Sequence, residues 1–351
     1  MEHKSEFNPL NLCRENVKSL APYTSARDEY VSNGTKMVFL DANENPNETG
    51  VNRYPDPLQR SLRSSIASLK NLPENQLLFG NGSDEVLDLL FRAFCEPNQD
   101  AVITFPPTYG MYGVLAGINS VQVHEIPLTT AFEIDMEQYR SHAFTATKML
   151  FICSPNNPSG NLMDRIHIEE ILNTFKGLVV VDEAYIDFTE ASSWANRLSD
   201  FPNLVVIQTL SKAYGLAGIR LGMLMASPEI ISLLHKIKPP YNVNELTQSK
   251  AQERLEQGER IQSEVNLIVA QRKVLENALK ELPFVKEVFP SEANFVLVRV
   301  DHADLRYRQL LDQGIVVRNR SKQLHCENTL RLTVGTPDEN KKLIETLYTL
   351  S

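Results

Sequence analysis

The stretches LVVVDEAYIDF (residues 178–188) and LVVIQTLSKAYGLAGIRLGMLMA (residues 204–226) decide the fold class of this chain. Each begins with an uninterrupted run of Val, Leu and Ile, which is typical of a β-strand buried on both faces. The first run ends at Asp182, and the second is followed by Ser211 and Lys212. Buried strands of this kind favour an α/β fold with a mainly parallel sheet.

Similar runs surround these two stretches and alternate with helical patterns. Strands are predicted at residues 76–79, 101–105, 120–126, 148–153, 178–182, 204–209 and 219–226, and helices at 57–70, 83–94, 109–117 and 164–175. The alternation is typical of a parallel sheet flanked by helices. We therefore predict a large domain over residues 44–240.

The pattern changes after residue 240. Residues 245–282 are helical and rich in charge, and the strand-like runs FVLVRV (295–300), GIVVRN (314–319) and LRLTVG (330–335) follow them. These segments predict a smaller α+β domain over residues 241–351. Residues 1–43 are less regular, and we expect them to form an arm that packs with the small domain.

The composition excludes several classes of protein. The 351 residues include 35 basic and 44 acidic side chains, a net charge of −9, so nucleic acid is not the expected partner. No apolar run approaches the roughly 18 residues that span a bilayer, and the N-terminus does not resemble a signal peptide. The four cysteines form no C-x-x-C pair, which predicts neither a metal site nor a disulfide framework. We expect a cytoplasmic protein with reduced thiols.

Candidate chemistry lies at the predicted strand ends, where open α/β sheets bind ligands. The glycine-rich turn at residues 80–85 precedes a helix, whose free N–H groups attract phosphate, although a plain N-cap has the same residues. Lys212 either extends to solvent or acts as a nucleophile toward carbonyls. Arg220, eight residues later, is suited to bidentate phosphate binding. With Asp182 and Asn157, these residues form an ordered set that pyridoxal phosphate requires.

The sequence resembles the fold-type I pyridoxal-phosphate-dependent aminotransferases, and within them the histidinol-phosphate aminotransferase subfamily. The resemblance depends on NENP (43–46), NRYPD (52–56), TYGMY (108–112), DEAYIDF (182–188) and TLSKAYGLAGIR (209–220). It extends from Tyr23 to Gly335, and the stretch at 209–220 is its most specific part. The implied fold has a large domain with a mainly parallel sheet flanked by helices and a smaller α+β domain.

The resemblance implies roles around the cofactor ring. Lys212 would form a Schiff base with the pyridoxal phosphate aldehyde and later carry the proton between substrate and cofactor. Asp182 would pair with the ring nitrogen. Asn157 and Tyr185 would donate to the phenolic oxygen, and Tyr109 would stack on the ring.

The resemblance also implies a phosphate site and a second subunit. Four residues would hold the cofactor phosphate, namely Ser83, Asp84, Ser211 and Arg220. Tyr54, in NRYP, would reach the cofactor of the neighbouring subunit, which implies a homodimer with shared active sites.

Substrate binding is assigned to the small domain and the arm. Arg331, in LRLTVG, resembles the carboxylate-binding arginine of the family, and Arg318 lies thirteen residues before it. Two arginines suit substrates that carry a carboxylate or a phosphate. Tyr23 and Asn43 resemble contacts that the arm makes with substrate.

These roles predict transamination of L-histidinol phosphate with 2-oxoglutarate, giving imidazole-acetol phosphate and glutamate in histidine biosynthesis. Threonine-phosphate decarboxylases and aromatic aminotransferases share the fold and the cofactor, so they are the alternative interpretations. A cofactor-binding regulator is a third hypothesis, which the acidic net charge disfavours because such proteins bind DNA.

Overall fold

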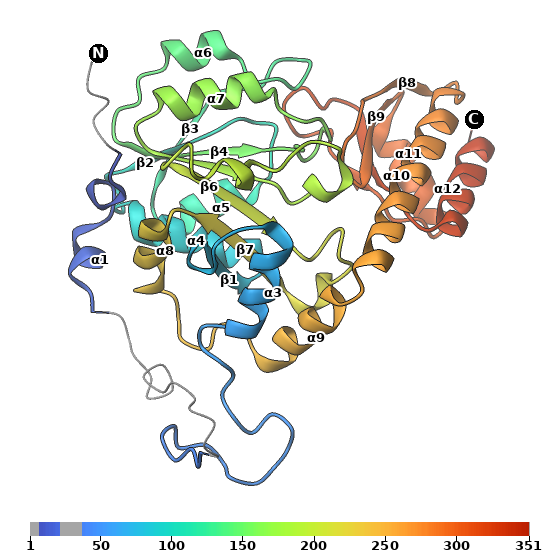
Figure 1. Ribbon diagram of the computed structural model, residues 1–351. Helices are drawn as coiled ribbons and strands as arrows, with labels where there is room; N and C mark the ends of the chain where they lie inside the picture. Colours follow the sequence, from blue (N-terminus) through green and yellow to red (C-terminus); the bar gives the residue numbers. More distant parts are fainter. Residues whose placement is uncertain (1–6, 22–36, 351) are drawn as a thin grey trace.

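The structure is a computed structural model that describes residues 7–21 and 37–350 (Figure 1). A large domain surrounds a seven-stranded sheet, and a small domain with a four-stranded sheet lies beside it. No helix in these described ranges combines the length and apolar character needed to cross a membrane.

The sheet of the large domain is mainly parallel, which confirms the predicted fold class. Its strands are β1 (Leu77–Asn81), β2 (Ala101–Thr104), β3 (Gln122–Glu125), β4 (Thr147–Cys153), β5 (Leu178–Asp182), β6 (Leu204–Thr209) and β7 (Leu221–Ala226). Their order is β1-β7-β6-β5-β4-β2-β3, and β7 runs antiparallel to both of its neighbours.

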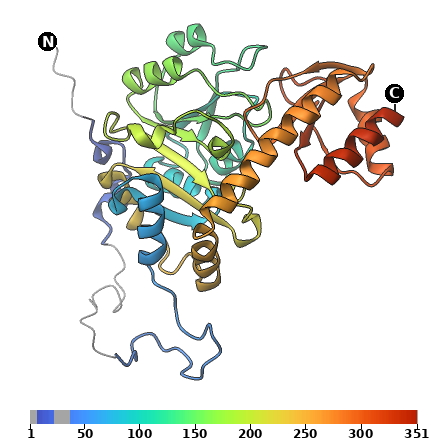
Figure 2. The same cartoon turned by 45° about the vertical axis from the view of Figure 1, so that its right-hand side comes forward.

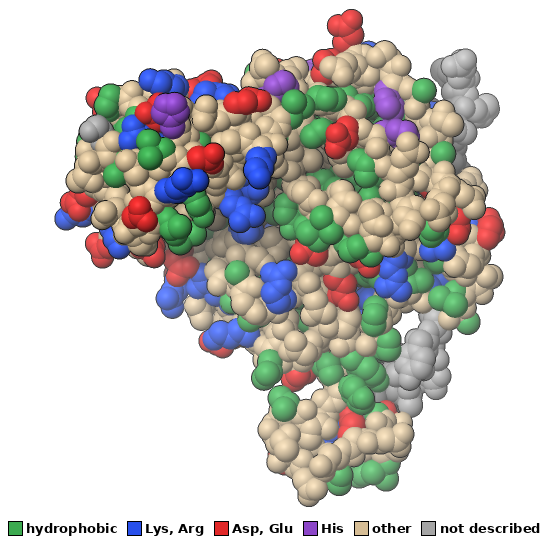
Figure 3. Space-filling model, turned by 180° about the vertical axis from the view of Figure 1, so that it is seen from behind, with side chains coloured by type: hydrophobic (Ala, Val, Ile, Leu, Met, Phe, Trp, Pro, Cys, Tyr) green, Lys and Arg blue, Asp and Glu red, His purple; other side chains and the backbone are tan. Residues whose placement is uncertain are grey.

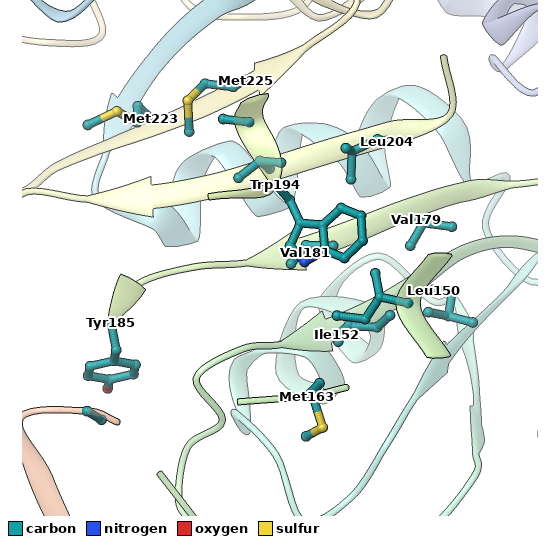
Figure 4. Packing of buried hydrophobic residues seen from close by; sticks show 14 of the residues in the cluster. Leu150, Ile152, Met163, Val179, Val181, Tyr185, Trp194, Leu204, Met223 and Met225 are labelled. Carbon is teal, nitrogen blue, oxygen red and sulfur yellow. The ribbon is translucent and has the colours of Figure 1, made fainter. Parts of the chain in front are cut away.

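Helices cover both faces of this sheet, so strand residues are buried on alternate sides. One face packs on α3 (Arg60–Lys70), α6 (Met136–Ser141) and α7 (Arg165–Thr174), and the other on α1 (Glu15–Ser19), α4 (Ser83–Phe94), α5 (Met111–Ile118) and α8 (Pro228–His235). Figure 4 shows the first face, where Val179 and Val181 of β5 lie beside Leu150 and Ile152 of β4. Burial on both faces explains the uninterrupted apolar runs.

The small domain follows a long helix. Figure 2 shows α10 (Gly258–Lys280) running from the large domain to the small one. The antiparallel small sheet has the order β10-β11-β9-β8, formed by β8 (Val285–Val288), β9 (Phe295–Val300), β10 (Arg318–Asn319) and β11 (Thr329–Thr333). Helices α10, α11 (Ala303–Asp312) and α12 (Pro337–Thr349) pack on it.

Short elements complete the chain. They are α9 (Glu245–Leu255) and the 3-10 helices η1 (Pro9–Asn11), η2 (Glu74–Gln76), η3 (Ile186–Phe188), η4 (Trp194–Arg197) and η5 (Ala217–Ile219). Helix α9 contacts α3 of the large domain, where Gln252 Nε2 donates to Ser65 Oγ at 2.7 Å. The domain division at residue 240 therefore stays a prediction, because a helix beyond it still packs on the large domain.

The described part of the arm contacts the large domain. The backbone N–H of Arg14 donates to the Ala93 carbonyl at 2.9 Å, and the Arg14 guanidinium pairs with Glu96 at 3.0 Å. Cys13 and Val17 are buried in the same core cluster as α4. The prediction that the arm packs with the small domain is wrong for residues 7–21, because their apolar and charged partners lie at the end of α4.

Candidate active site

A cavity lies at one edge of the large sheet, where strand direction brings distant residues together. Strands β4, β5 and β6 are neighbours and parallel, so their carboxyl ends meet at this edge. Because β7 is antiparallel, it begins at the same edge, immediately after Arg220. The lining residues are Ser83, Asp84, Tyr109, Cys153, Asn157, Asp182, Ala184, Tyr185, Thr209, Ser211, Lys212 and Arg220. Every residue predicted to hold the cofactor lines this cavity except Tyr54.

Asp182 is the buried acid of the cavity. Its side chain ends β5, and the residue is 3% exposed. The Tyr112 hydroxyl donates to Asp182 Oδ2 at 2.8 Å, and the Ala184 backbone N–H donates to Oδ1 at 3.1 Å. Burial raises the pKa of Asp182 to about 6, while these two donors oppose the rise. The carboxyl is therefore ionised above about pH 6 and able to accept another N–H donor.

Lys212 is the amine of the cavity. Its side chain reaches solvent through the open cleft, and Nζ lies 5.7 Å from the centre of the Tyr185 ring. Partial desolvation by the surrounding protein lowers the pKa of Lys212 most, and the positive charge of Arg331 lowers it further. Asp182 acts in the opposite direction. A lowered pKa increases the fraction of neutral amine, which is the nucleophilic form.

Asn157 connects the large domain to the small one. Its amide Nδ2 donates to the Tyr185 hydroxyl at 3.5 Å, and its Oδ1 accepts from Arg331 Nη1 at 2.5 Å. Arg331 comes from β11 of the small sheet, and its guanidinium lies 5.2 Å from the centre of the Phe295 ring. The small domain thus adds a positive charge beside the cavity.

The start of α4 forms a cradle in the same cavity as Lys212. Gly82 precedes the helix with a φ of +79°, and a Cβ at this position would sit 2.5 Å from Arg220 Nη2. Arg220 lies 3.7 Å from Asp84 Oδ2, and Asp84 Oδ1 accepts from the Tyr109 hydroxyl at 3.0 Å. The Asp84 carboxylate is therefore engaged, which leaves its backbone N–H, with that of Ser83, as the group suited to a phosphate. Glycine allows this close approach.

Four of the described residues predicted for the site do not line the cavity. They are Arg331, which lies beside it and bonds to Asn157, and Arg318, Tyr54 and Asn43. Arg318 is exposed and lies opposite Arg331 in the register of β10 and β11. Tyr54 is 51% exposed, and its ring stacks on Tyr241 at 4.6 Å. Asn43 is exposed in the same segment, beside a second hollow that Tyr54 also lines. Tyr23 lies outside the described residues.

Several residues of the site were not predicted from the sequence. Tyr112 donates to Asp182 although 70 positions separate them, and no local pattern indicated the pairing. Cys153 lines the cavity because it pairs with Asp182 in the β4–β5 register. Arg320 lies near Arg331 and Tyr185 and influences the pKa of Tyr185. Its position two residues after Arg318 places both on one face of an extended strand.

Known proteins share the sequence and the fold of this chain. The sequence profile described as "Aminotransferase class I and II" matches residues 32–347, so the chain belongs to that family. The protein named histidinol-phosphate aminotransferase in Flavobacterium johnsoniae is 56% identical over 346 residues, which cover 98% of this chain and 99% of that one. The protein of the same name in Christiangramia forsetii is 55% identical over 340 residues, 97% of each chain.

A solved structure shows the same architecture. The crystal structure of the histidinol-phosphate aminotransferase from Clostridium acetobutylicum superimposes with a TM-score of 0.79 at 25% identity. The similarity covers 86% of this chain and 91% of that chain. Identity at this level is far below that of the two relatives, so it supports chiefly the fold.

The cofactor of the family, pyridoxal 5'-phosphate, fits the residues of the cavity. The Lys212 amino group forms no hydrogen bond or ion pair with another described residue, and Asp182 has room for one more donor. Ser83, Ser211 and Arg220 provide donors for a phosphate at the start of α4. An amine, a buried carboxylate and a phosphate cradle in one cavity are the three anchors that this cofactor needs.

Proposed function

We propose that the protein transfers the amino group of L-histidinol phosphate to 2-oxoglutarate, giving imidazole-acetol phosphate and glutamate in histidine biosynthesis. One observation carries the proposal: Lys212 and Asp182 line one cavity, and Arg331 of β11 lies beside it, bonded to the lining residue Asn157. The high identity to relatives named for this activity supports the choice of substrate. The four cysteines are free and buried, which is compatible with the reducing cytoplasm where we infer that the enzyme acts.

We infer that the cavity binds the cofactor by its ring and its phosphate. When bound, pyridoxal phosphate supplies an electron sink for the bonds of the substrate carbon. Asp182 would accept a hydrogen bond from the ring nitrogen, and Asn157 and Tyr185 would donate to the phenolic oxygen. Tyr109 would cover the ring face. The backbone at Ser83 and Asp84, with Ser211 and Arg220, would hold the phosphate.

Lys212 would act twice. Its neutral amine would hold the cofactor by its aldehyde, and the same amine would move a proton at the substrate carbon. Burial and neighbouring arginines lower the pKa of the amine, so a larger fraction is neutral near pH 7 than for an exposed lysine. The negative charge of Asp182 raises the pKa of Lys212, so the protonation of the amine depends on that of the carboxyl.

Arg331 and Arg318 would recognise the anionic groups of both substrates. They are directly opposite in the register of two strands, so their guanidiniums share one face of the small sheet. Histidinol phosphate brings a phosphate, whereas glutamate brings carboxylates, and a planar guanidinium binds either anion in bidentate fashion. Asn43 and Tyr23 remain proposed substrate contacts of the arm.

We also propose a homodimer in which Tyr54 reaches the cofactor of the neighbouring subunit. Tyr54 does not line the cavity of its own chain. The segment around it leaves the body of the large domain (Figure 1) and exposes apolar side chains, among them Val38 at 79% and Leu40 at 87%. Exposed apolar segments of this size are typical of interfaces.

Mixing two inactive variants tests this arrangement. In a shared site, Lys212→Ala and Tyr54→Ala chains form a hybrid dimer with one intact site and one doubly defective site. Refolding the two together should therefore restore part of the activity, and neither variant alone should show it. A monomer by sedimentation, or no recovery in hybrids that do form, would contradict the proposal.

A half-reaction without oxo acid tests the activity itself. The holoenzyme is mixed separately with L-histidinol phosphate, O-phospho-L-threonine and L-phenylalanine while the visible absorbance of the bound cofactor and the products are followed. We expect loss of the band and formation of imidazole-acetol phosphate with histidinol phosphate. Carbon dioxide from phosphothreonine, with no reaction of histidinol phosphate, would replace the proposal with decarboxylation. Preference for phenylalanine would indicate an aromatic aminotransferase.

A further inference from the structure

Arg318, Arg320 and Arg331 share one face of the small sheet. Arg318 lies opposite Arg331 in the register of β10 and β11. The backbone N–H of Arg320 donates to the Thr329 carbonyl at 2.9 Å, so the pairing of the two segments continues past the end of β10. Because side chains alternate along an extended strand, Arg318 and Arg320 lie on the same face.

This face is the one that packs on the large domain. Arg331 pairs with Leu297 of β9, which is buried in the same core cluster as Tyr185. The guanidinium of Arg331 lies over Phe295, and the Phe295 ring contacts the Tyr185 ring at 5.2 Å. Figure 3 shows Lys and Arg side chains gathered in the hollow between the two domains. The arginine face therefore borders the cavity that holds Tyr185.

Arg320 has no protein counter-ion among the described residues. Its side chain forms no hydrogen bond or ion pair within this part of the chain, and its Nε is buried without a partner. The Nε of Arg331 is buried and unpartnered as well. Burial, followed by the positive charges of Arg331 and Arg318, lowers the pKa of Arg320 to about 10, so the group stays charged at pH 7. An unpaired, partly buried charge is costly unless a ligand compensates it.

The chemistry of the two proposed substrates differs at this point. A phosphate monoester carries between one and two negative charges at pH 7, whereas each carboxylate carries one. Two guanidiniums are enough to neutralise a carboxylate. A third adds most to the electrostatic attraction when the ligand charge approaches −2. Arg320 is a third guanidinium beside Arg318 and Arg331, the pair proposed to bind the anionic group of either substrate.

We propose that Arg320 is a third arginine of the substrate anion site, which binds the phosphate of a phosphorylated substrate and makes the site prefer phosphate to carboxylate. The proposal rests on the proposed function for the identity of that substrate. It is independent of which residues hold the cofactor, because Arg320 does not line the cofactor cavity.

The test compares two amino donors on one holoenzyme. Arg320→Gln removes the charge and keeps a polar side chain, Arg320→Lys keeps the charge, and Lys322→Gln removes an exposed charge two residues away as the matched control. The KM is measured for L-histidinol phosphate and for glutamate, with thermal unfolding as a folding check. Inhibition of the glutamate reaction by inorganic phosphate is measured for each variant.

Arg320→Gln should raise the KM for histidinol phosphate and the Ki of inorganic phosphate about 10- to 100-fold, the range for a lost charge-assisted contact. Its KM for glutamate should change less than about threefold. Arg320→Lys should be intermediate, and Lys322→Gln should match the unaltered enzyme. An equal change for both donors, or no change for either, would overturn the proposal.

Failure of the proposed function gives a different result. If the unaltered holoenzyme rejects histidinol phosphate, the proposed activity is wrong, but inorganic phosphate still reports on the anion site. A Ki for phosphate that is unchanged by Arg320→Gln overturns the role of Arg320 whatever the natural substrate is. A raised Ki supports it for another phosphorylated substrate.

Discussion

The two halves of the cleft differ in how their charges are satisfied. On the large-domain side, Asp182 accepts from Tyr112 and from the Ala184 backbone, and the Asp84 carboxylate is engaged by Tyr109 and Arg220. On the small-domain side, Arg331 and Arg320 have buried nitrogens without partners among the described residues. The two acids of the first half are preorganised, whereas the arginines of the second half have spare donors.

This difference matches two kinds of ligand. A cofactor that stays bound needs groups fixed in place before it arrives, because fixed groups need no reorganisation during the reaction. Two substrates bind in turn and are released. They need strong hydrogen-bond donors that are not already bonded to protein groups. Removing groups from each half should therefore give different defects, and the predictions below test that separation.

Lys212→Ala should give the largest effect. The variant loses the only side chain proposed to move the proton, so turnover should fall by at least about 10³-fold, within the range for general acid–base catalysis. It should still retain the cofactor, because Asp182 and the phosphate cradle remain. Single-turnover kinetics and cofactor content after gel filtration measure the two properties. Lys250→Ala, at an exposed lysine of α9, is the control. Full activity of Lys212→Ala would disprove the assignment of the cavity.

Arg331→Gln should impair both substrates without loss of cofactor. Its guanidinium is proposed to bind the anion common to the two, so we expect the KM values for histidinol phosphate and glutamate to rise together by about 100-fold. The absorbance of the bound cofactor should persist. Arg299→Gln is the control, because Arg299 on neighbouring β9 pairs with Glu287 at 3.3 Å. Loss of cofactor from Arg331→Gln would show that the small-domain half also contributes to cofactor binding.

Tyr112→Phe should weaken cofactor binding without affecting the substrate anion site. The hydroxyl donates to the ionised carboxyl of Asp182 and so lowers its pKa, which means that its loss moves that pKa upward from about 6. More of Asp182 is then protonated at pH 7 and cannot accept from a protonated ring nitrogen. We expect about tenfold weaker cofactor binding at pH 7, in keeping with one lost hydrogen bond to a charged group.

The pH dependence distinguishes this effect from a general loss of structure. The difference in cofactor affinity between Tyr112→Phe and the unaltered protein should shrink at higher pH, where Asp182 is ionised in both. Tyr139→Phe removes a hydroxyl from another buried tyrosine, whose partner is Thr174 at 2.9 Å, and should leave affinity unchanged. A difference that does not vary with pH would contradict the role given to Tyr112.

The cofactor half could be predicted from sequence more completely than the substrate half. Strand β5, strand β6 and helix α4 have the predicted bounds, because apolar runs and a glycine-rich turn mark them locally. Strand direction then brings their ends to one edge, which places Asp182 and Lys212 together. Local patterns carry this information because Asp182 ends a marked strand, Lys212 closely follows another, and Ser83 begins a marked helix.

The rest depends on contacts between distant segments. The hydrogen bond from Tyr112 to Asp182 joins α5 to β5, and nothing in either segment identifies the partner. In the small domain, the strand expected at 314–319 is confined to Arg318–Asn319, and Arg320 lies just beyond both the predicted and the observed strand. The arm was misplaced because its pairing of Arg14 with Glu96 spans 82 residues. Pairings of this kind are decided by packing.

Asp301→Asn should give the smallest effect, and it tests whether paired arginines in the small domain serve stability instead of binding. Arg306 forms two bonds to Asp301, at 2.9 and 2.7 Å, and lies over Phe284, in contrast to the unpartnered Arg320. The hydrogen bonds from Arg306 lower the pKa of Asp301 to about 2. A lowered folded-state pKa stabilises the protein above the unfolded value, near 3.9, and this contribution is lost as pH falls toward 2.

The variant should therefore lose about 1 kcal/mol in the free energy of unfolding at pH 7, since the pair is partly screened by solvent. The difference from the unaltered protein should disappear between about pH 4 and pH 2, as urea unfolding at several pH values would measure. The KM values for both amino donors should not change. A raised KM in Asp301→Asn would mean that an arginine with a protein partner also supports substrate binding. The presence or absence of a protein partner would then not explain the difference between the two halves of the cleft.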